Sequence, residues 1–232
     1  MIYNYLEWDS DFFGFKVSQI VKKEISKYEL SLVLDELRKE NFKLVYMFLL
    51  NGIVFSIPYV EIKYIQKKIT YKKEIRVPIK INNNIRKFER KNPSDRLVNL
   101  AIVSGEFSRF RLDGNIYYSK FKELYEGWIV SSVNKKIALG VLVYEVNNII
   151  AGMVTYDKFE NHGKIGIISV DQSYRRLNIA SSLLNAAEFY LAKAGCDEIT
   201  IVTQDCNKPA CRLYEKKGYK IKKIENVYHM WL

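Results

Sequence analysis

The chain has 232 residues, 48% of them hydrophobic, which is enough apolar material for one large domain or two small ones with a buried core. This composition excludes a disordered chain. The net charge of +11 favours anionic partners such as nucleotides, coenzyme A, nucleic acid or an acidic membrane surface, although a lysine-rich surface that serves only solubility has the same charge.

The cysteines and the N-terminus indicate the compartment. Cys196, Cys206 and Cys211 lack the spacing of metal ligands, so reduced thiols and no metal site are the simplest interpretation. The first residues show neither the basic nor the apolar region of a signal peptide, and no stretch approaches the ~20 apolar residues of a membrane-spanning helix. We therefore expect a soluble cytoplasmic protein.

The first third of the chain predicts a small α/β piece. Residues 6–15 combine a tryptophan and three phenylalanines with three carboxylates and a glycine, which suits a buried aromatic corner or a ligand contact and taken alone favours the core. A capping box at 26–29 begins an amphipathic helix that runs to about Glu40. The apolar run 44–50 predicts a buried strand, and 59–69 predicts another.

The middle of the chain is basic. Residues 71–96 lack periodicity and are interpreted as a connector whose charge could grip phosphate or RNA, or simply face solvent. In an extended segment, Arg109 and Arg111 would point to one side, where paired guanidinium groups favour phosphates and carboxylates; surface salt bridges are the alternative. Residues 117–134 predict a helix with an apolar stripe.

The second half predicts a meander followed by a crossover. Runs 137–144 and 149–156 are joined by Glu145-Val146-Asn147-Asn148, the composition of a hairpin, and 165–170 predicts a third strand. A helix crosses from there to a strand at 198–202, which should therefore lie parallel to the third strand.

The crossover helix opens with a candidate anion site. Residues 179–194 recur at helical spacing, and Gly195 suits the C-terminus of a helix. A turn that leads directly into a helix presents unpaired backbone N–H groups at the positive end of the helix dipole, which suits a pyrophosphate. Arg175 and Arg176 add positive charge there, although an ordinary turn with two surface arginines would have the same sequence pattern.

A second helix follows Asn207. Asn207 is a good N-cap, Pro209 lies in the first turn and Gly218 marks the end. A lone tyrosine at helical spacing, such as Tyr214, is more often a core residue than a catalytic one.

These two segments resemble the GCN5-related N-acetyltransferase (GNAT) superfamily. Residues 175–180 match the pyrophosphate pattern Arg/Gln-x-x-Gly-x-Gly/Ala, with Asn178 in place of a glycine, and Asn can adopt the left-handed conformation. Residues 207–219 match Asn-x-x-Ala-x-x-Leu-Tyr-x-x-x-Gly-Phe/Tyr. The resemblance implies an α/β (α+β) fold with a mixed, mostly antiparallel sheet that splays at the cofactor strand. We expect a smaller N-terminal α/β domain at 1–80, the basic connector at 81–97 and the acetyltransferase domain at 98–232.

The resemblance also implies roles for residues, with acetyl-CoA as cosubstrate. Backbone groups of Ile168 and Val170 would contact the pantetheine arm, Asn207 would contact the cofactor, and Tyr214 would be the general acid to the leaving sulfur. The pyrophosphate loop would consist of Arg175, Arg176, Leu177, Asn178, Ile179, Ala180 and Ser181. No general base is identified; the possible carboxylates are Asp9, Asp11 and Glu61.

A narrower resemblance concerns the acceptor. Residues 7–14 and 107–111 are similar to segments of the dTDP-fucosamine acetyltransferases, which acetylate a dTDP-linked 4-amino-4,6-dideoxygalactose for polysaccharides such as O-antigen. This implies a nucleotide-linked amino sugar as partner, no nucleic acid or membrane, and Asp9, Phe13, Arg109 and Arg111 as substrate-binding candidates. The alternatives are a GNAT enzyme for a protein, antibiotic or small amine, and a basic nucleic-acid-binding module. A homodimer could form through an exposed sheet edge of the N-terminal piece.

Overall fold

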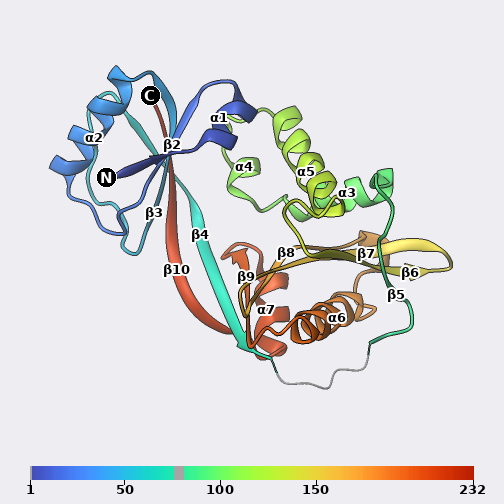
Figure 1. The fold of residues 1–232 in the computed structure, drawn as a ribbon. Coiled ribbons are helices and arrows are strands. Elements are labelled where there is room, and N and C mark those ends of the chain that lie inside the picture. Colours follow the sequence, from blue (N-terminus) through green and yellow to red (C-terminus); the bar gives the residue numbers. More distant parts are fainter. Residues whose placement is uncertain (1, 76–80) are drawn as a thin grey trace. The chain divides into compact units, whose positions relative to one another are not determined.

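The computed structural model describes residues 2–75 and 81–232, and the chain forms two compact units (Figure 1). The first unit comprises Met1–Ile69, Gln204–Cys206 and Lys223–Leu232, and the second comprises Thr70–Thr203 and Asn207–Lys222. These units differ from the expected linear domains, because the chain returns to the first unit with its last strand.

The first unit is a sheet with the strand order β1-β2-β3-β10-β4, in which β4 and β10 also continue into the second unit. Its elements are β1 (Tyr3–Tyr5), α1 (Glu7–Phe13), β2 (Lys16–Ile20), α2 (Lys27–Lys39), β3 (Phe42–Leu49), β4 (Glu61–Glu74) and β10 (Lys220–Trp231). The predicted helix and capping box are confirmed, since Ser26 accepts a hydrogen bond from the N–H of Glu29 and the Glu29 carboxylate accepts from Ser26. Helix α2 packs its leucines onto one sheet face in a core with Val45, Met47 and Met230.

The aromatic stretch near the N-terminus is the helix α1, which ends at Gly14 with φ of 78°. The expectation of a buried corner is wrong for Trp8, which is 53% exposed and stacks on Phe12 at 5.4 Å. Ser10 is the one buried residue of this helix. A helix of seven residues can bury only one side of two turns, so its rings pack on one another instead.

The second unit is built on the order β4-β9-β8-β7-β6-β5. Its further elements are β5 (Ile85–Lys87), α3 (Asp95–Ser104), α4 (Arg109–Leu112), α5 (Tyr118–Val133), β6 (Gly140–Val146), β7 (Ile149–Phe159), β8 (His162–Val170), the 3-10 turn Gln172–Tyr174, α6 (Ile179–Lys193), β9 (Glu198–Gln204) and α7 (Lys208–Lys216). The predicted hairpin is confirmed, with Asn147 and Asn148 both at positive φ in its turn. The predicted antiparallel meander and the parallel pairing of β8 with β9 are also confirmed.

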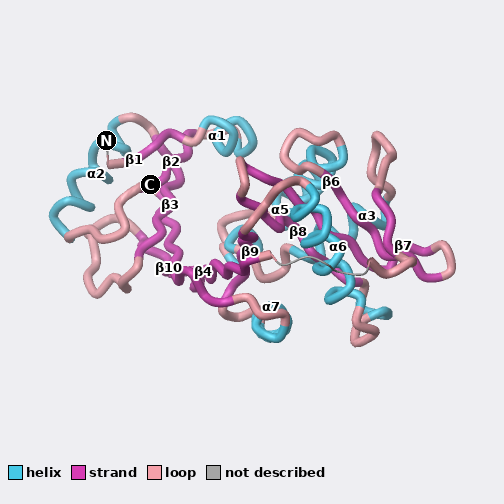
Figure 2. Tube along the Cα trace, turned by 60° about the horizontal axis from the view of Figure 1, so that its bottom comes forward, coloured by secondary structure: helices cyan, strands magenta, loops and turns pink. Residues whose placement is uncertain are grey.

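Helices cover both faces of the strands β6 to β8, which run side by side in Figure 1 and Figure 2. Helices α3 and α5 share a buried cluster with Val141, Val143 and Met153 on one face. On the other face, α6 approaches β7 so closely at Gly152 that a Cβ there would lie 3.1 Å from side chains of Ile179 and Leu183. This close contact fixes the position of the first turn of α6 on the sheet.

The basic stretch 71–96 is only partly a connector. Residues 76–80 lie outside the described residues, but 85–87 form β5, which pairs with β6, and Asp95 already begins α3. The interpretation of 71–96 as a connector is therefore wrong for residues 71–74, which belong to β4, and for residues 85–87 and 95–96. Among the described residues, no helix is both long and apolar enough to cross a membrane.

Candidate active site

The central feature of the second unit is a point where two parallel strands separate. The ladder between β8 and β9 runs from His162 opposite Glu198 to Ile165 opposite Ile201, whereas β8 continues to Val170 and β9 to Gln204. Over the same length, β8 stays paired with β7 on its other side as far as Val170 opposite Gly152. The sheet is therefore splayed at the strand where the sequence predicts the cofactor.

The splay leaves backbone groups directed into the gap. The N–H of Ile167 donates to Oγ1 of Thr155 on β7 at 2.8 Å. Because the N–H groups of successive residues in a strand point to opposite sides, those of Ile168 and Val170 point away from β7 and toward β9. A buried N–H or C=O group requires a partner, so these groups fit an extended polar ligand between the strands. Their contact with pantetheine stays a prediction.

The loop after β8 turns sharply into α6. Arg176 has φ of 64° and Asn178 has φ of 61°, so both adopt the left-handed conformation, and Asn178 does so at the position where the superfamily pattern has glycine. Asn178 is the N-cap of α6 but makes no side-chain capping bond, and its C=O accepts the first helical bond from Ser182. The N–H groups of residues 179–181 consequently have no partner within the helix, which suits an anion.

The side chains of this loop divide into exposed and buried ones. Residues 175–178 are exposed, and Nε of Arg175 lies 3.4 Å from the C=O of Val170. Ile179, in contrast, is 2% exposed, so only its backbone can contact a ligand. Residues 175–178 therefore offer side chains to a ligand, whereas the side chain of Ile179 packs in the core.

An arginine that the sequence analysis did not single out braces the start of the loop. Arg96 on α3 donates to the C=O of Ile150 and, at 3.0 Å, to Oδ2 of Asp171, while its guanidinium lies 5.8 Å from the ring centre of Tyr174. Asp171 Oδ1 also accepts from the N–H of Ser173. No local sequence signal indicates this contact, because Arg96 lies in the stretch interpreted as a connector and reaches the loop only through the fold.

Helix α7 carries the second pair of predicted residues. Oδ1 of Asn207 accepts from the N–H of Ala210 at 3.3 Å, which confirms the N-cap and leaves the amide nitrogen as a donor for a ligand. Tyr214 is 2% exposed and lies against Tyr71 and Tyr219. Burial, and to a smaller extent the nearby Cys211 thiol, raises the pKa of Tyr214. The phenol is therefore protonated at neutral pH, as a proton donor must be.

The candidate substrate residues lie in both units. Arg109 and Arg111 are in α4, which begins at Ser108, whose side chain accepts from the N–H of Arg111. The expectation that they share one side of an extended segment is wrong, because residues two apart on a helix face different directions. Nε of Arg111 lies 3.3 Å from Glu106, and the Arg109 guanidinium lies over the ring of Phe110.

Asp9 and Phe13 are on α1 in the first unit. Phe13 lies against the rings of Phe12 and Phe15 and is partly buried, as is Asp9. Their contact with a substrate stays a prediction.

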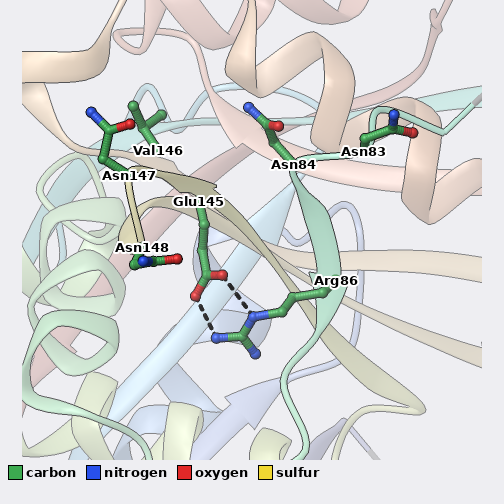
Figure 3. A pocket seen from close by; sticks show the side chains of 7 residues that line it. All are labelled: Asn83, Asn84, Arg86, Glu145, Val146, Asn147 and Asn148. Carbon is green, nitrogen blue, oxygen red and sulfur yellow. Dashed lines mark hydrogen bonds and ion pairs between the residues drawn. The ribbon is translucent and has the colours of Figure 1, made fainter.

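A polar pocket of about 360 Å³ lies at the tip of the β6–β7 hairpin (Figure 3). It is lined by Asn83, Asn84, Arg86, Glu145, Val146, Asn147 and Asn148. Arg86 forms a two-point ion pair with Glu145, which Figure 3 shows. None of the predicted site residues is in this lining, and its asparagines serve the turns on either side. Among residues 2–75 and 81–232, no group of three His, Cys, Asp or Glu side chains is placed to hold a metal ion.

Comparison with known proteins agrees with this geometry. The sequence model of the Acetyltransferase (GNAT) family matches residues 107–219, which include the splayed strand, the loop and both motif helices. This match covers just under half of the chain. The fold is similar to that of a GCN5-related N-acetyltransferase from Sphaerobacter thermophilus, which superimposes with a TM-score of 0.62 at 13% identity, over 98% of this chain and 75% of that one. A putative GNAT acetyltransferase from Novosphingobium aromaticivorans gives 0.56 at 12% identity, over 81% and 74%.

Curated relatives match a shorter segment of this chain. Human N-alpha-acetyltransferase 30 is 32% identical over 74 residues, which are 32% of this chain and 20% of the relative. The Dictyostelium discoideum protein of the same name is 35% identical over 74 residues, 40% of its length, and Arabidopsis thaliana N-alpha-acetyltransferase MAK3 is 33% identical over 70 residues, 36% of its length. The chain thus spans well under half of these relatives.

Proposed function

We propose that this chain is an acetyl-CoA-dependent N-acetyltransferase. The single observation that carries the proposal is the separation of β8 from β9 beyond Ile165, beside a helix N-terminus whose N–H groups lack helical partners. These two features fit the two polar parts of coenzyme A: the amide-bearing pantetheine arm in the gap and the pyrophosphate on the first turn of α6. Ile168, Val170 and residues 175–181 would hold it, together with Asn207.

The proposed chemistry uses a backbone N–H of the gap and the phenol of Tyr214. Acetyl-CoA supplies an acetyl group on a thioester. An N–H of the splayed strand would donate to the carbonyl oxygen as negative charge develops there. Tyr214 would donate its proton to the sulfur as the C–S bond breaks, and the acceptor amine would lose a proton to water or a carboxylate as its N–C bond forms. The proximity of Tyr214 matters more than its acidity, because burial raises its pKa.

For the acceptor, we propose an amine on a nucleotide-linked 4-amino-4,6-dideoxyhexose. The support is the similarity of residues 7–14 and 107–111 to enzymes of that specificity and the net charge of +11. Such charge favours an acceptor that carries a diphosphate.

A second candidate acceptor is the amino terminus of a polypeptide. It is favoured by the names of the curated relatives, which are N-alpha-acetyltransferases. Their alignments cover about a third of the chain, so they bear on the shared chemistry more than on the acceptor.

One assay separates the candidates. The protein is incubated with acetyl-CoA and, in parallel, with dTDP- and UDP-linked amino sugars, peptides with free amino termini and polyamines, while free thiol is measured. The proposal expects thiol release with a dTDP-linked amino sugar. Thiol release with peptides alone would establish the second candidate. If none of the tested amines causes thiol release, the proposed activity is overturned. Tyr214→Phe should lower kcat by at least about 100-fold, the usual contribution of a general acid, while the Kd for acetyl-CoA stays within twofold.

A further inference from the structure

The ring of Tyr214 lies between two other tyrosines. Its centroid is 5.7 Å from that of Tyr71 on β4, with the rings inclined at 68°, and 6.0 Å from that of Tyr219, inclined at 54°. Tyr71 is 1% exposed and Tyr219 is 3% exposed, so packing restricts the orientation of all three rings. The Tyr71–Tyr214 pair is edge-to-face and the Tyr214–Tyr219 pair is tilted, and aromatic contacts at these distances are favourable as well as restrictive.

Each flanking phenol is anchored on a carboxylate. The hydroxyl of Tyr71 donates to Oε1 of Glu215 at 2.8 Å, and the hydroxyl of Tyr219 donates to Oε1 of Glu188 at 3.0 Å. Burial first, and then these carboxylates, raise the pKa of both phenols. Both remain protonated donors, and hydrogen bonds to a charged acceptor are stronger than those between neutral groups.

Glu188 extends this arrangement to the cofactor helix. It lies on α6, is 1% exposed, and its Oε2 accepts from Nζ of Lys73 at 2.7 Å. The Lys73 ammonium also lies 5.3 Å from the ring centre of Tyr219. A buried carboxylate is costly unless it is paired and hydrogen-bonded, and here both of its oxygens are used. Glu188 therefore joins α6, β4 and the segment after α7 at one point.

We propose that Tyr71 and Tyr219 are positioning residues for Tyr214, held in place by Glu215 and Glu188, and that Glu188 couples this placement to α6. The inference rests on the proposed function, in which Tyr214 donates the proton to sulfur. Loss of either anchor lets the flanking ring rotate, and the Tyr214 hydroxyl then deviates from the position that proton transfer needs. A shift of about 1 Å is enough to slow a reaction strongly.

The experiment compares Tyr219→Phe, Tyr71→Phe and Glu188→Gln with the parent chain, each by thiol release with the best acceptor and by thermal unfolding. We expect kcat to fall about tenfold in each, with the KM for acetyl-CoA within twofold, because the rings remain and only their anchors are lost. The matched control is Tyr190→Phe on α6, whose ring stacks on Tyr156 at 5.8 Å; its kcat should equal that of the parent.

A double variant separates positioning from stability. If Tyr219 acts through Tyr214, then the double variant Tyr214→Phe with Tyr219→Phe has the same kcat as Tyr214→Phe alone. If Tyr219→Phe instead reduces the fraction of folded protein, the fold-decreases in kcat of the two single variants multiply in the double variant. A multiplied effect, or an unchanged kcat in both Tyr219→Phe and Tyr71→Phe while Tyr214→Phe is slow, would overturn the inference and leave the proposed function intact. An unchanged kcat in Tyr214→Phe would remove the acid assignment, and the inference with it.

Discussion

Gly152 on β7 is the position where the start of α6 depends most directly on a missing side chain. In Gly152→Ala, the new Cβ would lie 2.9 Å from the backbone oxygen of Ser169 and 3.1 Å from side-chain carbons of both Ile179 and Leu183. A backbone oxygen cannot rotate away, so β8 or α6 must shift. Overpacking of this kind costs typically about 1–3 kcal/mol. At about 2–4 °C for each kcal/mol in a chain of this size, the melting temperature should fall by several degrees.

The same shift should weaken cofactor binding. Ile179 begins α6, and its N–H is one of the groups that we propose to hold the pyrophosphate, so we expect the Kd for coenzyme A, measured by calorimetry, to rise about tenfold. Gly127→Ala on α5 is the matched control: Gly127 is exposed and a Cβ there meets no atom within 4 Å. Alanine in a helix is favoured over glycine by about 0.5–1 kcal/mol, so this variant should be more stable. If Gly152→Ala has the parent's melting temperature and the parent's Kd for coenzyme A, the packing argument is refuted.

Three further predictions concern the loop, a buried carboxylate and a helix cap. Asn178 has φ of 61°, so Asn178→Gly should keep the Kd for coenzyme A while Asn178→Val raises it; equal Kd values would contradict the role of the left-handed turn. Burial raises the pKa of Glu225, but its three lysine partners outweigh this and lower it to about 2 from 4.5, so its contribution to stability is present above pH 4.5 and is lost as the pH falls toward 2. Glu225→Gln should therefore be less stable than the parent at pH 7 and closer to it at pH 2.5, and urea unfolding that shows an equal gap at both would exclude this linkage. Ser26→Ala removes a capping box and should lower the free energy of unfolding by about 1 kcal/mol. An unchanged free energy of unfolding would show that the cap does not stabilise α2.

Elements with local signals were predictable from the sequence. Helix α2 carries its capping box at Ser26, α7 its cap at Asn207, and α6 its end at Gly195, where φ is 84°. The β6–β7 hairpin is marked by Asn147 and Asn148, which tolerate the positive φ of its turn. In each case a few neighbouring residues determine the backbone, so no distant contact is required.

Elements that depend on distant partners were missed or misread. Strand β10 begins with lysines and exists because it pairs with β3, about 180 residues earlier, as in Met230 opposite Val45. Strand β5 has three residues and depends on pairing with β6. Helix α4 has four residues, too few for any periodicity, and only the cap at Ser108 shows that Arg109 and Arg111 are helical.

The candidate site divides in the same way. The motifs indicate the loop at 175–181, Asn207 and Tyr214, because each carries its residues within a short segment. The brace from Arg96 to Asp171 and the anchor from Glu188 to Tyr219 join residues 75 and 31 positions apart, so no single segment records either contact. These supporting contacts become visible only once the sheet brings the segments together.

The most direct test of the central claim is backbone amide hydrogen exchange with and without acetyl-CoA. The account predicts slower exchange at Ile168 and Val170 and at the first-turn amides of residues 179–181, with little change at the far end of α6 near Lys193. Binding of acetyl-CoA that leaves these amides unchanged, or protection confined to other strands, would contradict it.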